Sequence, residues 1–201
     1  MKKTLKWIGI ILGCLLVVGF LLFLYFIPPF PSMSAQDIIE PELAAGPDLK
    51  GIADPRERLM AEHGKYIVLT RDCSGCHTSG ASGPDYSKYL AGGAKTIIPG
   101  FGTAVCLNLT SDSQTGLGNH TDEEILTALR SGLKNTGELM HHRFMPWDVW
   151  SNWTEEDRRA VVVYLRHLKP VHHRIPDFVP ASPADSGSAE VFYGGDYSVK
   201  E

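Results

Sequence analysis

Five consecutive residues decide what the folded part of this chain contains. Cys73-Ser74-Gly75-Cys76-His77 has the spacing C-x-x-C-H, the attachment signature of c-type haem, and it occurs once in the 201 residues. Two thiols separated by two residues on one helical turn can reach the two vinyl groups of one porphyrin and form thioethers. The next residue then projects its imidazole toward the iron, and its second ring nitrogen is expected to donate to a carbonyl. The sequence therefore predicts one covalently attached haem c, with Cys73 and Cys76 as the attachment residues and His77 as an iron ligand.

Other uses of these cysteines fit the sequence less well. A thioredoxin-like dithiol belongs in a βαβ unit, and the pattern around Cys73 does not indicate one. A zinc site needs two further ligands at finger-like spacing, and Cys106 stands alone. A disulfide between Cys73 and Cys76 would close a short, strained loop. Cys106 is interpreted as a small buried residue without a chemical role.

The sixth coordination position of the iron has several candidates. Met33 lies in a linker and Met60 lies on the helix before the motif. Met145 precedes Pro146, and a residue before proline is pushed away from helical backbone. Met145 therefore lies in an irregular segment between two helices, where a side chain can project into a pocket, and it is the preferred ligand. The alternatives are an open position, Met140, His120, His141 and His142.

The amino terminus indicates the compartment. Residues 7–27 carry no charge, and their length matches the ~20 residues needed to cross a bilayer core. Three lysines precede this segment, so the positive-inside rule places the N-terminus in the cytoplasm and the rest of the chain on the far side. Residues 1–27 are predicted to be an uncleaved single-span anchor; a cleaved signal peptide is the alternative, because residues 32–34 are a passable cleavage site. Cys14 lies in a lipoprotein-like tetrapeptide and is interpreted as part of the apolar helix.

Proline content and helix-start signals divide the remainder of the chain. Residues 28–53 are proline-rich and are predicted to be an extended spacer. A first helix is expected from Asp54 to about Arg71, because Asp54 can cap it and a proline suits its first position. Two more helices are expected after the capping residues Thr121 and Thr154, each with acids in its first turn.

The segment between the first two helices shows no sustained period. Residues 78–118 are rich in Gly, Pro and Ser, and a loop of that length usually wraps around something. The expected fold is therefore all-α: a small helical domain over residues 54–171 around one haem. Residues 172–201 are polar, with several Gly and Pro, and are predicted to be a loosely ordered extension.

Charge argues against one class of partner. The chain has 19 Lys and Arg against 23 Asp and Glu, and the three lysines before the apolar segment leave the rest still more acidic. An acidic folded portion does not bind phosphate backbones as its main role, so no nucleic-acid partner is expected.

Several short motifs, taken in order, resemble those of a known family. The chain is similar to class I c-type cytochromes, especially to the haem domains of membrane-bound cytochrome subunits of bacterial alcohol, aldehyde and gluconate dehydrogenases. The matching pieces are Gly64-Lys65-Tyr66, Cys73 to Thr78, Phe101-Gly102-Thr103, Asn108-Leu109-Thr110-Ser111-Asp112, Thr115-Gly116-Leu117-Gly118, Met145-Pro146 and Ala160 to Leu168. This resemblance implies that Met145 ligates iron and that the first and last helices cross near Gly64 and Tyr164. Those subunits usually carry three haem domains, whereas this chain has one haem motif.

These features predict an electron-transfer protein rather than an enzyme. A membrane-anchored monohaem cytochrome would pass single electrons between a dehydrogenase or respiratory complex and an acceptor. Its partners would be redox proteins: a dehydrogenase subunit, an oxidase or another cytochrome. With the bacterial resemblance, the expected location is the inner membrane, single-pass, with the haem domain on the periplasmic side. The alternatives are a haem enzyme or sensor that reacts with gas or peroxide through a labile sixth ligand, and a structural subunit of a respiratory complex.

Overall fold

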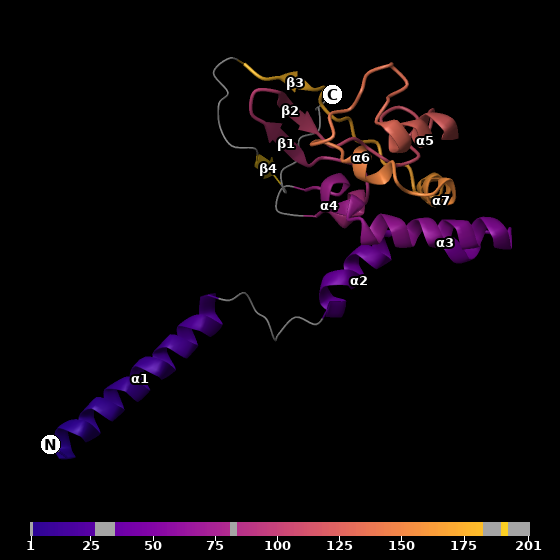
Figure 1. Ribbon diagram of the computed structural model, residues 1–201. Coiled ribbons are helices and arrows are strands. Elements are labelled where there is room, and N and C mark those ends of the chain that lie inside the picture. The colour runs from indigo at the N-terminus through magenta and orange to yellow at the C-terminus, as the bar shows by residue number, and fades with distance from the viewer. Residues whose placement is uncertain (1, 27–34, 81–83, 183–189, 193–201) are drawn as a thin grey trace. The chain divides into compact units, whose positions relative to one another are not determined.

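The computed structural model describes residues 2–26, 35–80, 84–182 and 190–192 (Figure 1). The chain divides into two compact units, Met1–Leu43 and Ala44–Glu201. The first contains the apolar helix and the second contains the haem motif. Each unit is described by itself.

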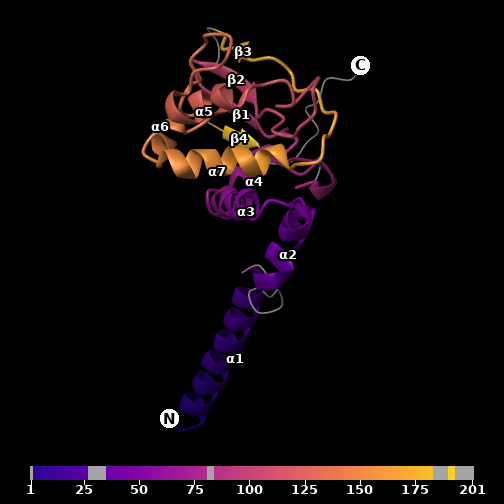
Figure 2. The same ribbon diagram turned by 90° about the vertical axis from the view of Figure 1, so that its right-hand side faces the viewer.

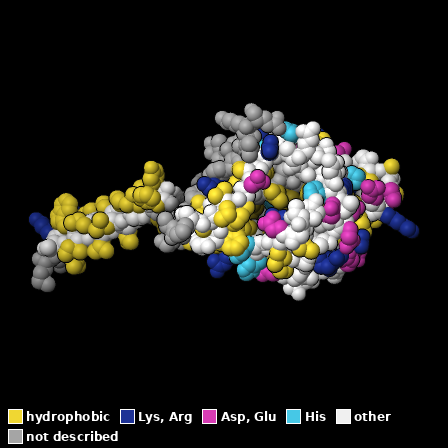
Figure 3. Space-filling model, turned by 90° about the horizontal axis from the view of Figure 1, so that it is seen from above, with side chains coloured by type: hydrophobic (Ala, Val, Ile, Leu, Met, Phe, Trp, Pro, Cys, Tyr) yellow, Lys and Arg dark blue, Asp and Glu magenta, His cyan; other side chains and the backbone are white. Residues whose placement is uncertain are grey.

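Helix α1, Lys2–Phe26, is long and apolar enough to cross a membrane. Its side chains are almost uniformly apolar apart from the lysines at its start (Figure 3), and its hydrophobic residues are exposed. A helix of this length and composition near the N-terminus suits an anchor or a signal sequence.

Helix α2, Ala35–Ala45, differs from the extended spacer expected over residues 28–53. It contains Pro41, yet alanine, glutamate, glutamine and leucine around the proline are good helix formers. Proline content therefore predicts the wrong conformation for this part of the spacer. Residues 27–34, also in the expected spacer, lie outside the described residues.

Two helices form the frame of the haem-motif unit. Helix α3, Pro55–Thr70, is capped by Asp54, whose carboxylate accepts the Arg56 N–H at 2.9 Å. Helix α7, Glu155–Arg166, begins at Thr154 with a reciprocal capping box to Asp157. The two helices lie side by side in Figures 1 and 2. Both begin where the sequence predicts, because their start signals are local.

Helix α5, Asp122–Ser131, and the short helix α6, Trp147–Trp150, complete the helical layer. Thr121 and Glu124 form a capping box at the start of α5, and Gly132 ends it in the left-handed conformation with φ +70°. The core lies between α3, α5, α6 and α7. Its buried members include Ala61, Val68, Leu90, Ile125, Leu126, Trp150, Ala160, Val161, Tyr164 and Leu165.

Two strands of a small antiparallel sheet lie within the segment expected to be a long loop, and two lie near the C-terminus. Strands β1, Lys95–Ile98, and β2, Gly102–Val105, form a hairpin, and the sheet order is β3-β2-β1-β4 with β3 at Val179–Pro180 and β4 at Glu190–Phe192. Four-residue strands are too short to give a clear alternating pattern, so the sequence does not reveal them. The mostly helical fold is confirmed, and the structure adds this small sheet to the expected all-α description.

The segment after α7 corrects the expectation for residues 172–201. His173 is buried, and its Nδ1 donates to the Ala91 carbonyl oxygen at 2.7 Å. Residues Val179 and Pro180 then pair with Thr103 and Gly102 of β2. Residues 172–182 are thus packed onto the unit rather than loosely held. Residues 183–189 and 193–201 lie outside the described residues.

Candidate functional site

The haem motif forms a turn of helix set off sharply from α3. The chain leaves α3 at Arg71, and Asp72 takes a left-handed conformation at φ 53°, ψ 39°. Helix α4, Cys73–His77, starts directly after it. A change of direction at one residue lets α4 begin at once, so Cys73, Cys76 and His77 share a single turn, as the motif predicts.

His77 is held in the form that binds iron. Its side chain is buried, and its Nδ1 lies 2.6 Å from the carbonyl oxygen of Leu107. A carbonyl oxygen only accepts, so Nδ1 carries the proton and Nε2 keeps its lone pair. Burial lowers the pKa of His77 and outweighs the opposing effect of the Leu107 hydrogen bond. The imidazole is therefore neutral and fixed in one orientation, as a haem ligand must be.

Backbone pairing places the Leu107 carbonyl behind His77. Gly92 donates its N–H to the His77 carbonyl at 2.7 Å, and Gly93 donates to the Cys106 carbonyl at 2.9 Å. Gly92 and Gly93 have φ angles of +87° and +119°, a backbone conformation that residues with a side chain rarely adopt. These two glycines bring the 106–107 segment against the end of α4. The sequence did not indicate Leu107, since every residue offers a carbonyl and the partner lies thirty positions away.

Cys73 and Cys76 form no disulfide, and each is partly exposed. Cys106 forms no disulfide either, and its partly buried thiol is hydrogen-bonded to that of Cys76. This hydrogen bond, with burial, raises the pKa of Cys106. Cys106 is thus a neighbour of the attachment site and not simply a small packing residue. The only signal in the sequence was that a fourth cysteine existed.

The candidates for the sixth position occupy different environments. Met145 is half-buried and packs against the hydrophobic core, and its N–H donates to the His141 carbonyl at 3.2 Å. His142 is exposed beside Asp148, at 3.5 Å, and His120 lies 3.7 Å from Glu124. Met145 thus packs against apolar side chains of the core, while these two histidines face carboxylates. The role of Met145 as an iron ligand stays a prediction.

Aromatic rings gather around the segment that carries Met145. Phe101 follows β1, Phe144 precedes Met145 and Phe178 precedes β3, and their ring centroids lie 5.4–5.8 Å apart. The His141 ring lies 4.1 Å from that of Phe101, and burial is the largest cause lowering its pKa. Phe101 and Phe178 remain 42% and 37% exposed. This aromatic cluster of Phe101, His141, Phe144 and Phe178 forms an apolar rim beside the Met145 segment.

A family model for cytochrome c matches residues 61–169, which contain the α4 turn, the Leu107 carbonyl and Met145. The chain belongs to the cytochrome c family. The resemblance seen in the sequence is therefore confirmed, and so is the crossing of α3 and α7 near Gly64 and Tyr164 that it implied: a Cβ on Gly64 would lie 2.9 Å from the Tyr164 Cβ.

Curated relatives of this cytochrome are subunits of dehydrogenases. It is 31% identical to the fructose dehydrogenase cytochrome subunit of Gluconobacter japonicus over 150 residues, 71% of this chain and 29% of the relative. It is 31% identical to the alcohol dehydrogenase (quinone) cytochrome c subunit of Gluconobacter oxydans (strain 621H) over 128 residues, 62% and 25% of the two chains. The gluconate 2-dehydrogenase cytochrome c subunit of Pantoea cypripedii is 27% identical over 114 residues, 57% and 24%. The cytochrome matches about a quarter of the length of these relatives.

Membership of the cytochrome c family implies covalent haem c and a role as an electron carrier. The donor set fits that group: two thiols outside any disulfide and a neutral imidazole share one turn, and the imidazole keeps one nitrogen for iron. Two thiols and one imidazole nitrogen at this spacing suit iron that arrives within a porphyrin.

Proposed function

We propose that this cytochrome c is a membrane-anchored, monohaem carrier that accepts single electrons from a dehydrogenase and passes them to a respiratory acceptor. Cys73 and Cys76 would attach the haem, and His77 and Met145 would ligate its iron. Bound haem c supplies one-electron redox chemistry, and His/Met ligation places its potential in a high range. The observation that carries the proposal is the His77 imidazole, buried, neutral and oriented by Leu107 on the same turn as both cysteines.

The chain's own residues support reversible electron transfer. The hydrogen bond from His77 Nδ1 to the Leu107 carbonyl fixes the ring orientation, so little reorganisation need accompany a change of iron oxidation state. Burial of the imidazole excludes water from its surroundings. A Met145 thioether is a neutral ligand that suits both oxidation states of the iron.

The location and domain limits belong to the same proposal. Residues 1–27 would anchor the chain in the bacterial inner membrane through α1, with residues 54–171 as the haem domain on the periplasmic side. The apolar character of α1 and the lysines before it support this orientation. A tether raises the effective concentration of the domain near partners in the same membrane.

A dehydrogenase partner is supported by the relatives, whose names describe them as cytochrome subunits of dehydrogenases. The chain has one C-x-x-C-H motif, which supports one haem. Its donor would be a membrane dehydrogenase that oxidises an alcohol, sugar or related substrate.

The central test matures the full chain in a bacterium that attaches haem c. Its intact mass should rise by one haem, and the pyridine haemochrome should be of the two-thioether type; Cys73→Ala and Cys76→Ala should each shift it to the one-thioether type. The ferric protein should show the near-infrared band of methionine-ligated iron, absent in Met145→Ala and retained in Met140→Ala. If the mass of the chain does not increase by one haem, the proposed electron-carrier function is refuted. If the near-infrared band survives in Met145→Ala, the proposed role of Met145 as iron ligand is refuted.

A further inference from the structure

The loop that carries Met145 is closed by a tryptophan side chain. Trp147 Nε1–H donates to the Met140 carbonyl oxygen at 2.8 Å. The Met140 N–H in turn donates to the Gly132 carbonyl at 2.8 Å. The Trp147 side chain therefore joins the two ends of residues 140–147, here called the ligand loop, and Met140 ties the loop to Gly132, the residue that caps the end of α5. Met145 lies inside this closed loop.

The indole sits directly on the glycine that ends α5. Gly132 has φ +70°, and a Cβ there would lie 2.5 Å from both Cδ1 and Cε2 of Trp147. Only a residue without a side chain leaves this space to the indole. Gly132 thus has two roles: it permits the left-handed turn that ends α5, and it provides the flat backbone on which Trp147 rests.

The Met145 backbone is held from both sides within the loop. Phe144 and Met145 both donate their N–H groups to the His141 carbonyl, at 2.9 and 3.2 Å. The Met145 carbonyl accepts the Trp147 N–H at 2.7 Å. These short-range bonds shape the turn, but they do not tie it to the rest of the unit. The Met140 N–H, which donates to the Gly132 carbonyl, and the Trp147 indole, which packs on Gly132, make that connection.

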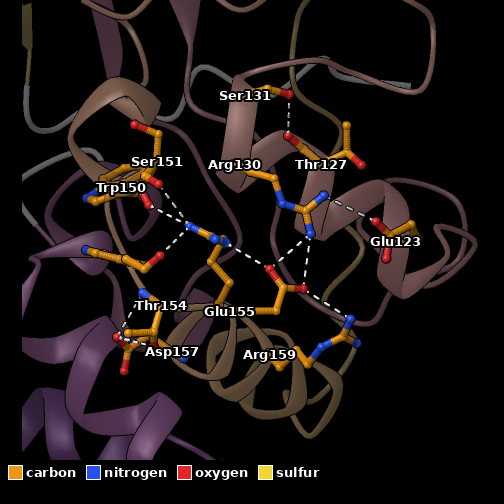
Figure 4. Close-up of polar contacts among 12 residues, drawn as sticks. Glu123, Thr127, Arg130, Ser131, Trp150, Ser151, Thr154, Glu155, Asp157 and Arg159 are labelled. Carbon is orange, nitrogen blue, oxygen red and sulfur yellow. Dashed lines mark hydrogen bonds and ion pairs between the residues drawn. The ribbon is translucent and has the colours of Figure 1, made fainter.

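The other side of the loop is anchored through α6. The buried Arg158 guanidinium donates from Nη1 to the carbonyl oxygens of Trp150, Ser151 and Trp153 at 3.3, 3.2 and 2.7 Å. Figure 4 shows Trp150 and Ser151 next to each other, with the dashed lines from both converging between them and Glu155. The ligand loop therefore lies between two fixed points, Gly132 at the end of α5 and the α6–α7 contact.

We propose that Trp147 is a positioning residue for Met145: its indole fastens the ligand loop to Gly132, so that the thioether stays where it can ligate iron. This inference rests on the proposed role of Met145. A ligand held by a preorganised loop loses little conformational entropy on binding, so it resists displacement by other ligands. The Nε1–H carries this effect, because its hydrogen bond to the Met140 carbonyl joins the last residue of the ligand loop to the first.

Cyanide binding to the ferric, haem-loaded full chain measures how often the loop opens, since cyanide takes the sixth position only after the native ligand has left. Trp147→Phe keeps a ring on Gly132 but removes the donor. We expect it to keep the Met145-dependent band near neutral pH and to bind cyanide about tenfold faster, the change that one hydrogen bond of ordinary strength allows. Trp153→Phe is the matched control, because that indole packs on Trp150 outside the loop, and its rate should match wild type.

Two further variants separate positioning from packing. Trp147→His retains a ring N–H and should recover part of the wild-type rate. Gly132→Ala leaves the tryptophan in place but displaces it, and should accelerate cyanide binding as Trp147→Phe does. If Trp147→Phe does not attach haem, the cyanide-binding rates of Trp147→His and Gly132→Ala, compared with wild type, still test the positioning role of Trp147.

The outcomes distinguish this inference from the function on which it rests. Suppose that wild type shows the Met145-dependent band and that Trp147→Phe and Gly132→Ala bind cyanide at the wild-type rate. This result would overturn the positioning role alone. Equal acceleration in Trp147→Phe, Trp147→His and the Trp153→Phe control would also overturn it, because general loosening would then explain the rates. A wild-type protein without the Met145-dependent band would overturn both proposals.

Discussion

Gly64 of α3 and Tyr164 of α7 touch so closely that a Cβ on Gly64 would lie 2.9 Å from the Tyr164 Cβ and closer still to the Ala160 carbonyl. Tyr164 is fully buried, and its hydroxyl donates to that of Tyr89 at 3.3 Å. The backbone of α3 therefore approaches the partner helix without a side chain between them. This contact holds α7 against the helix that leads into the haem motif.

Replacing Gly64 by alanine should separate the two helices. The added methyl meets main-chain atoms of α7 that cannot rotate away, so overpacking should lower the free energy of unfolding by about 1–3 kcal/mol. Urea unfolding of the haem-loaded protein, followed by circular dichroism, measures the change. Gly51→Ala is the control, since nothing lies within 4 Å of a Cβ at that exposed position. Equal stability of the two variants would show that the helix contact tolerates a methyl group.

The contact between α3 and α7 also includes a hydrogen-bonded carboxylate that should make stability depend on acid pH. Asp157 accepts a hydrogen bond from His63 Nε2 at 2.7 Å, and this bond is the largest cause lowering the Asp157 pKa, followed by the Thr154 hydroxyl. A carboxyl whose pKa is lowered by folding stabilises the native state above its unfolded pKa of ~3.9. That contribution is lost as pH falls through the native pKa.

Asp157→Asn should therefore be less stable than wild type near neutral pH, and the difference should shrink below about pH 4, where wild type itself becomes protonated. Thermal unfolding at a series of pH values measures the two curves. Asp177→Asn, a charge change on an exposed residue of the C-terminal segment, should leave the pH profile close to that of wild type. Parallel curves for Asp157→Asn and wild type from pH 7 to pH 3 would contradict the prediction.

The parts of the molecule that could be predicted from sequence are those encoded within a few residues. The capping boxes at Thr121 and Thr154 join a side chain to a backbone group three residues away, so the pattern and the contact nearly coincide. The α4 turn is equally local, because its two cysteines and its histidine lie within five positions. Local patterns of this kind therefore predict where the helices begin and which residues would attach the haem.

What sequence reasoning missed depends on backbone pairing between distant segments. Leu107 accepts the hydrogen bond of His77 through its backbone carbonyl, and a backbone carbonyl has no residue-specific signature in the sequence. Cys106 meets Cys76 only because Gly92 and Gly93 bring the two segments together. The short strands of the sheet and the packed segment 172–182 are further cases. Contacts of this kind are set by topology, so a one-dimensional pattern does not contain them.

Arg158 should be among the most sensitive charged residues of the unit. Its guanidinium is buried and donates to three carbonyl oxygens at the end of α6, so its removal leaves these acceptors without that partner. Arg158→Met should lower the free energy of unfolding by about 2–4 kcal/mol. Arg158→Lys should recover little, because one ammonium cannot serve both the carbonyl oxygens that Nη1 binds and the Glu155 carboxylate that Nε binds.

The control for this change is Arg159→Met on the same helix, whose side chain is 52% exposed and pairs with Glu155 at 3.1 Å. An exposed ion pair contributes ~0–1 kcal/mol, so this variant should unfold almost as wild type does. Chemical denaturation with a common slope compares the four proteins. Full recovery in Arg158→Lys would show that positive charge, and not the geometry of the guanidinium, holds the end of α6.

Asn108 should hold the segment after α7 in place. It is almost fully buried, and its Nδ2 donates to the Val171 carbonyl at 2.8 Å and to the Thr115 hydroxyl at 3.1 Å, while its Oδ1 accepts from the Thr110 N–H at 2.9 Å. Asn108→Ala removes these bonds and should release the chain that follows Val171. Limited trypsin digestion of the haem-loaded protein should then cut at Arg174 markedly faster than in wild type, with Asn119→Ala at a more exposed amide as the control. If Arg174 is cut equally slowly in all three proteins, the segment is held by the buried His173 and the pairing of Val179 with β2.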